Sequence, residues 1–150
     1  MHRVLKPNGV VAATVWLDMP LMGAARETMT KILGQAPPPP PINPLALAEP
    51  ASLDKPLQDA GFALLDDSVG AIHFDLGPED TAWQMGLLAV SATLKDLAAG
   101  GQHGDVWSRA RKEYAEATRG WRRGEGEARG HVLAPPGSYR LVVARKRLFV

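Results

Sequence analysis

The chain has 150 residues, of which 45% are hydrophobic, and its 17 Lys and Arg stand against 16 Asp and Glu, giving a formal net charge of +1. This length is enough for one domain with a core, and the balanced charge gives no general reason to expect a nucleic-acid or anionic-membrane partner. No cysteine is present, which excludes a disulfide framework, a thiolate metal site and a cysteine nucleophile.

Turn residues followed by an apolar run open the chain. Residues 6–9 read Lys-Pro-Asn-Gly, in which proline presets φ, asparagine tolerates the left-handed region and glycine closes the turn. Val10–Trp16 is then apolar apart from Thr14. An unbroken apolar run is typical of a strand covered by helices on both faces, as in a parallel sheet. We therefore predict a fully buried strand here, and we expect the chain to start in the middle of a fold.

Two helices are predicted next. Residues 21–33 repeat apolar side chains at helical spacing, and Gly34 follows in the position of a C-cap. Ser52 is a good N-cap for a second helix that ends at Gly61. Because proline deep inside a helix is costly, Pro56 favours a start at Ser52 or later.

Strand character returns in residues 62–65 and 69–76, which an acidic pair at 66–67 separates. A helical pair is then predicted, the first helix from a stripe at spacings of three and four and the second from Asp105 as N-cap; the stripe is Trp83, Leu87, Val90, Leu94 and Leu97. We expect a single partial domain over residues 1–150, made of a strand–helix–helix–strand part, an inserted helical pair and a final strand, at 1–76, 77–123 and 137–147 respectively.

No catalytic or metal-binding constellation stands out, so the catalytic residues are unknown. No Gly-x-Ser-x-Gly elbow is present, and residues 124–130, although glycine-rich, have no apolar strand before them and no helix after them to bind a phosphate. The histidines are scattered, none four residues from another, so we expect no metal site; they are His2, His73, His103 and His131.

The segment after the first strand is a candidate binding site because of its position in the predicted sheet. In an open α/β sheet, ligands bind outside the carboxyl ends of the parallel strands. Trp16, Asp18 and Met19 would lie in the loop at such an end. Two interpretations stay open: a substrate-side role, or an ordinary core tryptophan followed by a turn aspartate.

The opening segment resembles a part of class I S-adenosylmethionine-dependent methyltransferases. Late in the core of that family, a helix ends in a pattern like Arg-Val-Leu-Lys-Pro-Gly-Gly and leads into the fifth strand; residues 3–9 here read Arg-Val-Leu-Lys-Pro-Asn-Gly and lead to Trp16. The later elements follow the family's order too: a helix ending at 60–62, a strand, a helical pair containing Trp83, and a last strand over 139–145. The resemblance covers essentially the whole chain.

This resemblance implies an α/β fold: the C-terminal half of a Rossmann-like methyltransferase sheet, with fifth strand, helix, sixth strand, inserted helical pair and seventh strand. The chain departs from the family in Asn8, where the family has glycine, and in Pro56. The family's glycine-rich cofactor loop and its ribose-binding acidic residue lie upstream of these elements, and no counterpart occurs in this sequence. We therefore expect no cofactor-binding residue in this chain and no binding of S-adenosylmethionine by it alone, although the complete parent enzyme uses that cofactor.

The implied function is methyl transfer from S-adenosylmethionine to a small-molecule substrate, of the type 11-like kind, with this chain as a C-terminal part that is inactive alone. Catalysis in that family is mainly placement of the acceptor atom, with a base where the acceptor must lose a proton. A complementing N-terminal half is the implied partner. Candidates for the acceptor pocket are Trp16, Asp18, Met19, Trp83, Gln84 and Leu87; the alternative is that they are core residues, as an apolar stripe more often is.

An alternative of another class is a non-catalytic interaction module derived from a methyltransferase fold. An unpaired edge on the strand at residues 10–15, and apolar stripes on the two late helices, would suit a protein partner. We expect neither a nucleic-acid nor a membrane partner. The sequence lacks a signal-peptide pattern and a spanning segment of about 18 apolar residues, which predicts a cytoplasmic or other intracellular soluble compartment.

Overall fold

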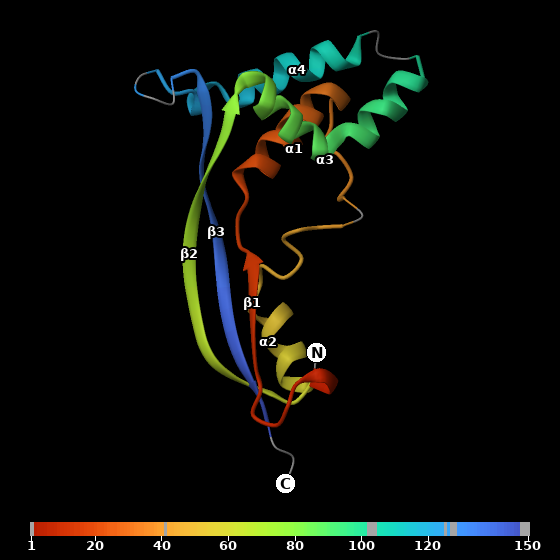
Figure 1. The fold of residues 1–150 in the computed structure, drawn as a ribbon. Helices are drawn as coiled ribbons and strands as arrows, with labels where there is room; N and C mark the ends of the chain where they lie inside the picture. The colour runs from red at the N-terminus through yellow and green to blue at the C-terminus, as the bar shows by residue number, and fades with distance from the viewer. Residues whose placement is uncertain (1, 41, 102–104, 125, 127–128, 148–150) are drawn as a thin grey trace. The chain divides into compact units, whose positions relative to one another are not determined.

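A computed structural model describes residues 2–40, 42–101, 105–124, 126 and 129–147. It shows an α/β fold with a small antiparallel sheet whose strand order is β1–β3–β2 (Figure 1); the strands are β1 (Val10–Trp16), β2 (Phe62–Pro78) and β3 (His131–Lys146). The helices are α1 (Pro20–Leu33), α2 (Pro50–Asp59), α3 (Glu79–Ala99) and α4 (Val106–Ala117), with 3-10 turns at His2–Val4 and Arg119–Trp121. None of the helices in these described ranges combines the length and the apolar character needed to cross a bilayer.

The chain forms two compact units. The sheet unit comprises Met1–Asp18, Pro40–Ile72 and Gly137–Val150, and therefore holds β1, α2 and parts of β2 and β3. The helical unit comprises Met19–Pro39 and His73–Pro136, with α1, α3, α4 and the remaining parts of β2 and β3.

The predicted turn before β1 is confirmed. Asn8 has φ of 60°, a left-handed conformation that asparagine adopts more readily than other non-glycine residues. The Gly9 N–H donates to the Lys6 carbonyl across 2.9 Å and closes the turn. The chain therefore enters β1 directly from a fixed direction.

The burial predicted for β1 is wrong. Its residues alternate between exposed and half-buried, and the strand pairs antiparallel with β3, from Val10 opposite Arg145 to Trp16 opposite Tyr139. Helix α2 packs on the sheet through a small apolar cluster, which consists of Leu57, Phe62, Val142 and Ala144 with Leu5, Val11, Leu53 and Leu64 around it. Since β3 is the sole ladder partner of β1 in the described residues, the apolar run belongs to an edge strand rather than to a central one.

Helix α2 begins earlier than predicted. Glu49 is its N-cap and Pro50 its first residue, so Ser52 lies in the first turn and Pro56 lies inside the helix. A proline at the first helical position loses no intrahelical hydrogen bond and has φ already set, which explains the earlier start.

The two predicted strand segments are one continuous strand, β2. The acidic pair does not interrupt it, because Asp67 forms a bidentate ion pair with Arg140 of β3, with both N···O distances at 2.7 Å. Strand β3 is also longer than predicted, since it begins at His131 instead of residue 137. Across the strands, His131 pairs with Asp75 at 3.0 Å, a contact between residues 56 positions apart that local patterns do not reveal.

Three predicted helix termini in the helical unit are confirmed. Helix α1 ends at Gly34, which has φ of 72° as a C-cap. Pro78 precedes α3, and Asp105 caps α4 by accepting a hydrogen bond from the Ser108 N–H at 3.1 Å. This contact with Ser108 holds the pKa of Asp105 below its ordinary value.

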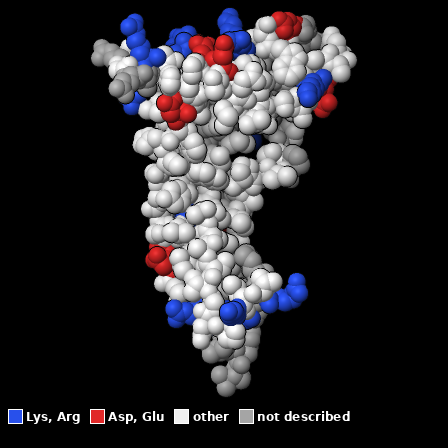
Figure 2. Space-filling model, viewed as in Figure 1, with Lys and Arg blue, Asp and Glu red and all other residues white. Residues whose placement is uncertain are grey.

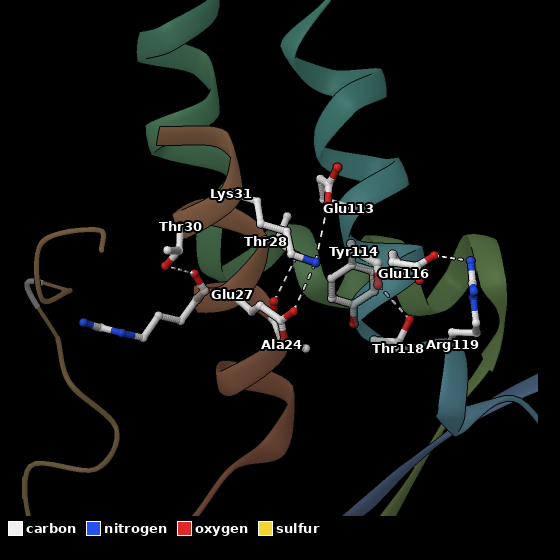
Figure 3. A network of polar contacts seen from close by, with 11 residues as sticks. Ala24, Glu27, Thr28, Thr30, Lys31, Glu113, Tyr114, Glu116, Thr118 and Arg119 are labelled. Carbon is white, nitrogen blue, oxygen red and sulfur yellow. Dashed lines mark hydrogen bonds and ion pairs between the residues drawn. The ribbon is translucent and has the colours of Figure 1, made fainter. Parts of the chain in front are cut away.

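Helices α1, α3 and α4 share one core, to which the predicted apolar stripe of α3 contributes Trp83, Val90 and Leu94. Lys31 of α1 lies between Glu27 and Glu113, at 3.1 and 3.5 Å, and so connects α1 with α4 (Figure 3). The hydrogen bond to Glu27 is the main reason that the pKa of Lys31 is raised.

Gly86 lets α3 approach α4 closely. A Cβ at this position would lie 2.6 Å from the Tyr114 ring, whereas a Cβ at Gly23 in α1 would meet nothing within 4 Å. We expect Gly86→Ala to lower the free energy of unfolding by about 1–3 kcal/mol through overpacking. The matched change Gly23→Ala should raise it by about 0.4–1 kcal/mol, because it restricts the unfolded chain. Urea unfolding followed by circular dichroism measures both, and equal stability of the two variants would contradict the packing.

Candidate ligand pocket beside Trp83

A pocket of about 340 Å³ lies on the helical unit. Its volume is at the lower end of the range of small-molecule sites, and the pocket is open to solvent rather than enclosed. Four of its residues come from the first two turns of α3 and one comes from α4; they are Asp80, Thr81, Trp83, Gln84 and Arg111. The lining thus offers an indole, a hydroxyl, an amide and a pair of opposite charges.

Trp83 is the apolar wall of this pocket. Its side chain is 7% exposed, and its ring packs on that of Tyr114 with centroids 5.7 Å apart and planes tilted by 54°. The same side chain therefore belongs to the helical core and to the pocket lining.

Asp80 and Arg111 form an ion pair at the pocket. Both side chains are exposed, so the pair contributes little to stability. Its two charges cancel at the rim, and a ligand therefore meets no net charge there.

Two of the predicted pocket candidates, Trp83 and Gln84, line this pocket together. Leu87 is half-buried and packs against the helical core. Met19 is the N-cap of α1, where its carbonyl accepts hydrogen bonds from Met22 and Gly23.

Trp16 and Asp18 belong to the sheet unit. The Trp16 ring contacts the Tyr139 ring edge-on, at 6.4 Å between centroids and 85° between planes. The Asp18 N–H donates to the Ser138 carbonyl at 3.2 Å. Gly70 leaves room for this arrangement, since a Cβ there would lie 2.5 Å from the Tyr139 hydroxyl.

Sequence reasoning missed three lining residues. Asp80 and Thr81 lie two and three residues after Pro78, in the first turn of α3, and Pro78 is a local signal that predicted only a helix start. Arg111 lies on a charged helix face, and such faces are usually solvated. Its pairing with Asp80, 31 positions away, is a product of the fold.

A second polar pair in the helical unit joins two strands. The Nδ1 atom of His131 lies 3.1 and 3.0 Å from the two carboxylate oxygens of Asp75, and the Gly77 N–H donates to the same carboxylate at 2.8 Å. The contact with His131, and then that with Gly77, holds the pKa of Asp75 below its ordinary value of 3.8.

This lowered pKa predicts a loss of stability in acid. A carboxyl group whose pKa is depressed on folding contributes stability above its unfolded pKa, and that contribution disappears as the pH falls through the folded value. We expect wild type to be more stable than Asp75→Asn at pH 6, and the difference to shrink as the pH falls below about 4. Urea unfolding of both proteins across this range measures it. A difference that stays constant with pH would contradict the role assigned to the carboxylate.

Metal binding finds no support in the described part of the chain, where no three His, Cys, Asp or Glu side chains gather in a way that could hold an ion. His103 lies outside the described residues.

Comparisons with known proteins do not decide the family. No protein-family model matches the chain, and no curated protein matches it. Among solved structures, it is similar to a protein from Bacillus halodurans described as a "putative methyltransferase", with 16% sequence identity and a TM-score of 0.44. The match covers 98% of this chain and 60% of that protein, so this chain spans about three fifths of its length. A likeness of this size establishes neither a shared fold nor a shared activity.

Proposed function

We propose that these residues form the acceptor-binding, C-terminal part of a methyltransferase that transfers a methyl group from S-adenosylmethionine to a small molecule. The observation that carries the proposal is the pocket in which Trp83 and Gln84 meet. These two residues belong to the helical pair that the sequence resemblance assigns to the substrate side. The tight turn that residues 6–9 form before β1 adds support, since residues 3–9, which carry the resemblance, end in that turn.

The residues present do not fit the cofactor itself. Helices α1, α2 and α3 begin after Met19, Glu49 and Pro78 with no glycine-rich loop before them. A phosphate- or cofactor-cradling helix start needs backbone N–H groups reached through small residues. The proposal therefore places S-adenosylmethionine binding on a segment outside these 150 residues.

The role that the proposal assigns to this chain is to position the acceptor for methyl transfer. The Trp83 indole offers an apolar face to an acceptor, and the Thr81 hydroxyl and Gln84 amide offer hydrogen bonds to its polar groups. Holding the acceptor in one orientation is how such a pocket would accelerate methyl transfer.

The sheet unit also has a surface that a second part of an enzyme would cover. Its exposed apolar strand residues are Val10, Leu65, Val69 and Ile72, and Val69 is 68% exposed. In the view of Figure 2, charged side chains are few over the middle of the strands. Leu65, Val69 and Ile72 lie on β2, an outer strand of the sheet in the described residues, and an outer strand is open to pairing with another chain. We propose that the cofactor-binding half of the same enzyme covers these exposed strand residues.

Titration calorimetry tests the proposal. S-adenosylmethionine should bind to the chain extended upstream in its gene and should not bind to the 150 residues alone. Tight binding by the 150-residue chain, or no binding by the extended chain, would contradict it. A methyl-transfer assay on the extended chain, with Trp83→Phe as the pocket variant, then reports on the acceptor side.

The second candidate function is a non-catalytic interaction module. The observation that favours it is the outer edge of β1, which has no strand partner among the described residues. An open edge of this kind pairs readily with another chain. Size-exclusion chromatography with light scattering discriminates: a defined complex with another protein, together with an extended chain that binds no S-adenosylmethionine, favours the module.

A further inference from the structure

Strand β1 is an outer strand of the sheet in the part of the chain that the structure describes (Figure 1). Its seven residues include no charged residue and no proline, and its register with β3 is continuous, without a bulge. Outer strands of natural sheets usually carry such features, because they prevent pairing with another chain. β1 lacks this protection.

The phase of the hydrogen bonds shows which main-chain groups of β1 point outward. In an antiparallel ladder, alternate residues exchange hydrogen bonds with the partner strand, and the residues between them direct N–H and C=O away from it. Before the strand, the Gly9 carbonyl accepts from the Lys146 N–H at 2.9 Å. After it, the Leu17 N–H donates to the Ser138 carbonyl, also at 2.9 Å. The odd-numbered residues therefore bond to β3. The outward groups belong to residues whose side chains are exposed as well, which are Val10, Ala12 and Thr14.

The same strand is complementary to a second copy of itself. In an antiparallel pair with a two-fold axis at Ala13, small residues face small ones and large residues face large ones: Ala12 faces Thr14, Val11 faces Val15, and Val10 faces Trp16 of the other copy. The two contacts between Ala12 and Thr14 each exchange two hydrogen bonds, because both residues direct their main-chain groups outward.

Neighbouring registers are less favourable. An axis at Ala12 places Trp16 opposite Asn8, which has left the extended conformation with φ of 60°. An axis at Thr14 places Val10 opposite the charged Asp18. The register about Ala13 uses all of β1 and contains no charge.

We propose that two copies of this chain associate through β1, whose strands pair antiparallel about Ala13 and join the two sheets into one. The paired strands are about 23 Å long, so the interface is small and the dimer forms in a concentration-dependent way. The inference goes beyond the proposed function, because the contact needs neither a cofactor nor an acceptor.

A single introduced thiol tests the register, since the chain has no cysteine of its own. Ala13→Cys faces its own copy in a non-hydrogen-bonded pair, where Cα atoms lie about 4.5 Å apart, a separation that a disulfide spans. Ala12→Cys is the matched control: it is more exposed, but it faces Thr14 of the other copy. After mild oxidation, electrophoresis should show a band at twice 16.1 kDa for Ala13→Cys and several-fold less of it for Ala12→Cys. Equal cross-linking of the two variants, or none of Ala13→Cys, overturns the proposal.

Sedimentation equilibrium of the 150-residue chain tests the association itself. Thr14→Pro removes an outward N–H and no bond to β3, and an outer strand tolerates proline at such a position. Thr14→Val keeps the N–H and is the matched control. We expect wild type and Thr14→Val to dimerise, and Thr14→Pro to associate at least about tenfold more weakly, because the dimer loses one hydrogen bond in each half.

Far-UV circular dichroism checks that Thr14→Pro is folded; if it is not, the cross-linking of Ala13→Cys decides alone. A wild-type chain that stays monomeric up to about 1 mM overturns the proposal. So does a dimer that Thr14→Pro leaves intact, since it uses another surface, and so does a monomer whose β1 edge binds a different protein.

Discussion

Replacing Arg140 with alanine should lower the free energy of unfolding by about 3–5 kcal/mol, because breaking a buried ion pair leaves an uncompensated charge behind. Arg140 is 4% exposed and joins β3 to both β2 and α2. It forms the bidentate pair with Asp67, donates to Asp54 at 2.9 Å and reaches the Pro50 carbonyl at 3.4 Å. The hydrogen bond to Asp67 is the main reason that the pKa of Arg140 is raised.

Asp54 explains most of the expected effect. One of its carboxylate oxygens, Oδ1, is buried and has no partner among the described residues, so Arg140 provides its compensating charge through the other. Asp67 is half-exposed and can be hydrated once Arg140 is removed.

Urea unfolding measures the change, with Arg119→Ala as the matched control. Arg119 also pairs with a carboxylate, that of Glu116, but its side chain is 71% exposed, so its loss should cost less than about 1 kcal/mol. Arg140→Lys should lie between the two, since one ammonium cannot reproduce the planar, bidentate contact. If Arg140→Ala were as stable as Arg119→Ala, the buried network would not hold the sheet unit together.

Truncation of Trp83 is the second change with a large expected effect. Trp83→Ala should lower the free energy of unfolding by about 3–5 kcal/mol, as for other buried tryptophans, because it removes the contact with Tyr114 and leaves a cavity in the helical core. The pocket would lose its apolar wall in the same step.

Leu88→Ala on the same helix is the control. Leu88 is 77% exposed, so its truncation should change stability by less than about 0.5 kcal/mol. Thermal and urea unfolding of the two variants give the comparison. A cost below about 1 kcal/mol for Trp83→Ala would mean that this side chain packs loosely, and would remove the reason to treat it as a wall between pocket and core.

Local chemistry predicted the elements that depend on neighbours in sequence. The turn with Asn8, the cap at Gly34 and the cap at Asp105 all follow from backbone preferences or side-chain hydrogen bonds within a few residues. The apolar stripe on α3 was also predictable from the sequence, because the 3.6-residue period of a helix places Trp83 and Leu94 on one face.

Long-range contacts account for the errors. An apolar run such as β1 looks the same at the centre and at the edge of a sheet, and only the strand order distinguishes the two. The sequence pattern predicted a break between two strands at the acidic residues 66–67. It did not reveal that Asp67 pairs with Arg140, 73 positions away. The start of β3 at His131 was likewise hidden, because its partner Asp75 lies on another strand.

The same difference between local signals and long-range contacts decides which residues of the candidate site the sequence could predict. Trp83 and Gln84 were found because they lie on a recognisable helix within a recognisable order of elements. Arg111 was not, because its place in the pocket depends on how α4 packs on α3.

The two glycines that accommodate tyrosine rings, Gly86 beneath Tyr114 and Gly70 beneath Tyr139, carry a consequence for the evolution of this chain. A larger residue at either glycine destabilises the fold unless the facing aromatic ring is lost as well. In any set of homologous sequences, positions 86 and 114 should therefore change together, and so should 70 and 139, because residues in contact co-vary. Such paired exchanges would identify distant relatives even where the opening segment has diverged.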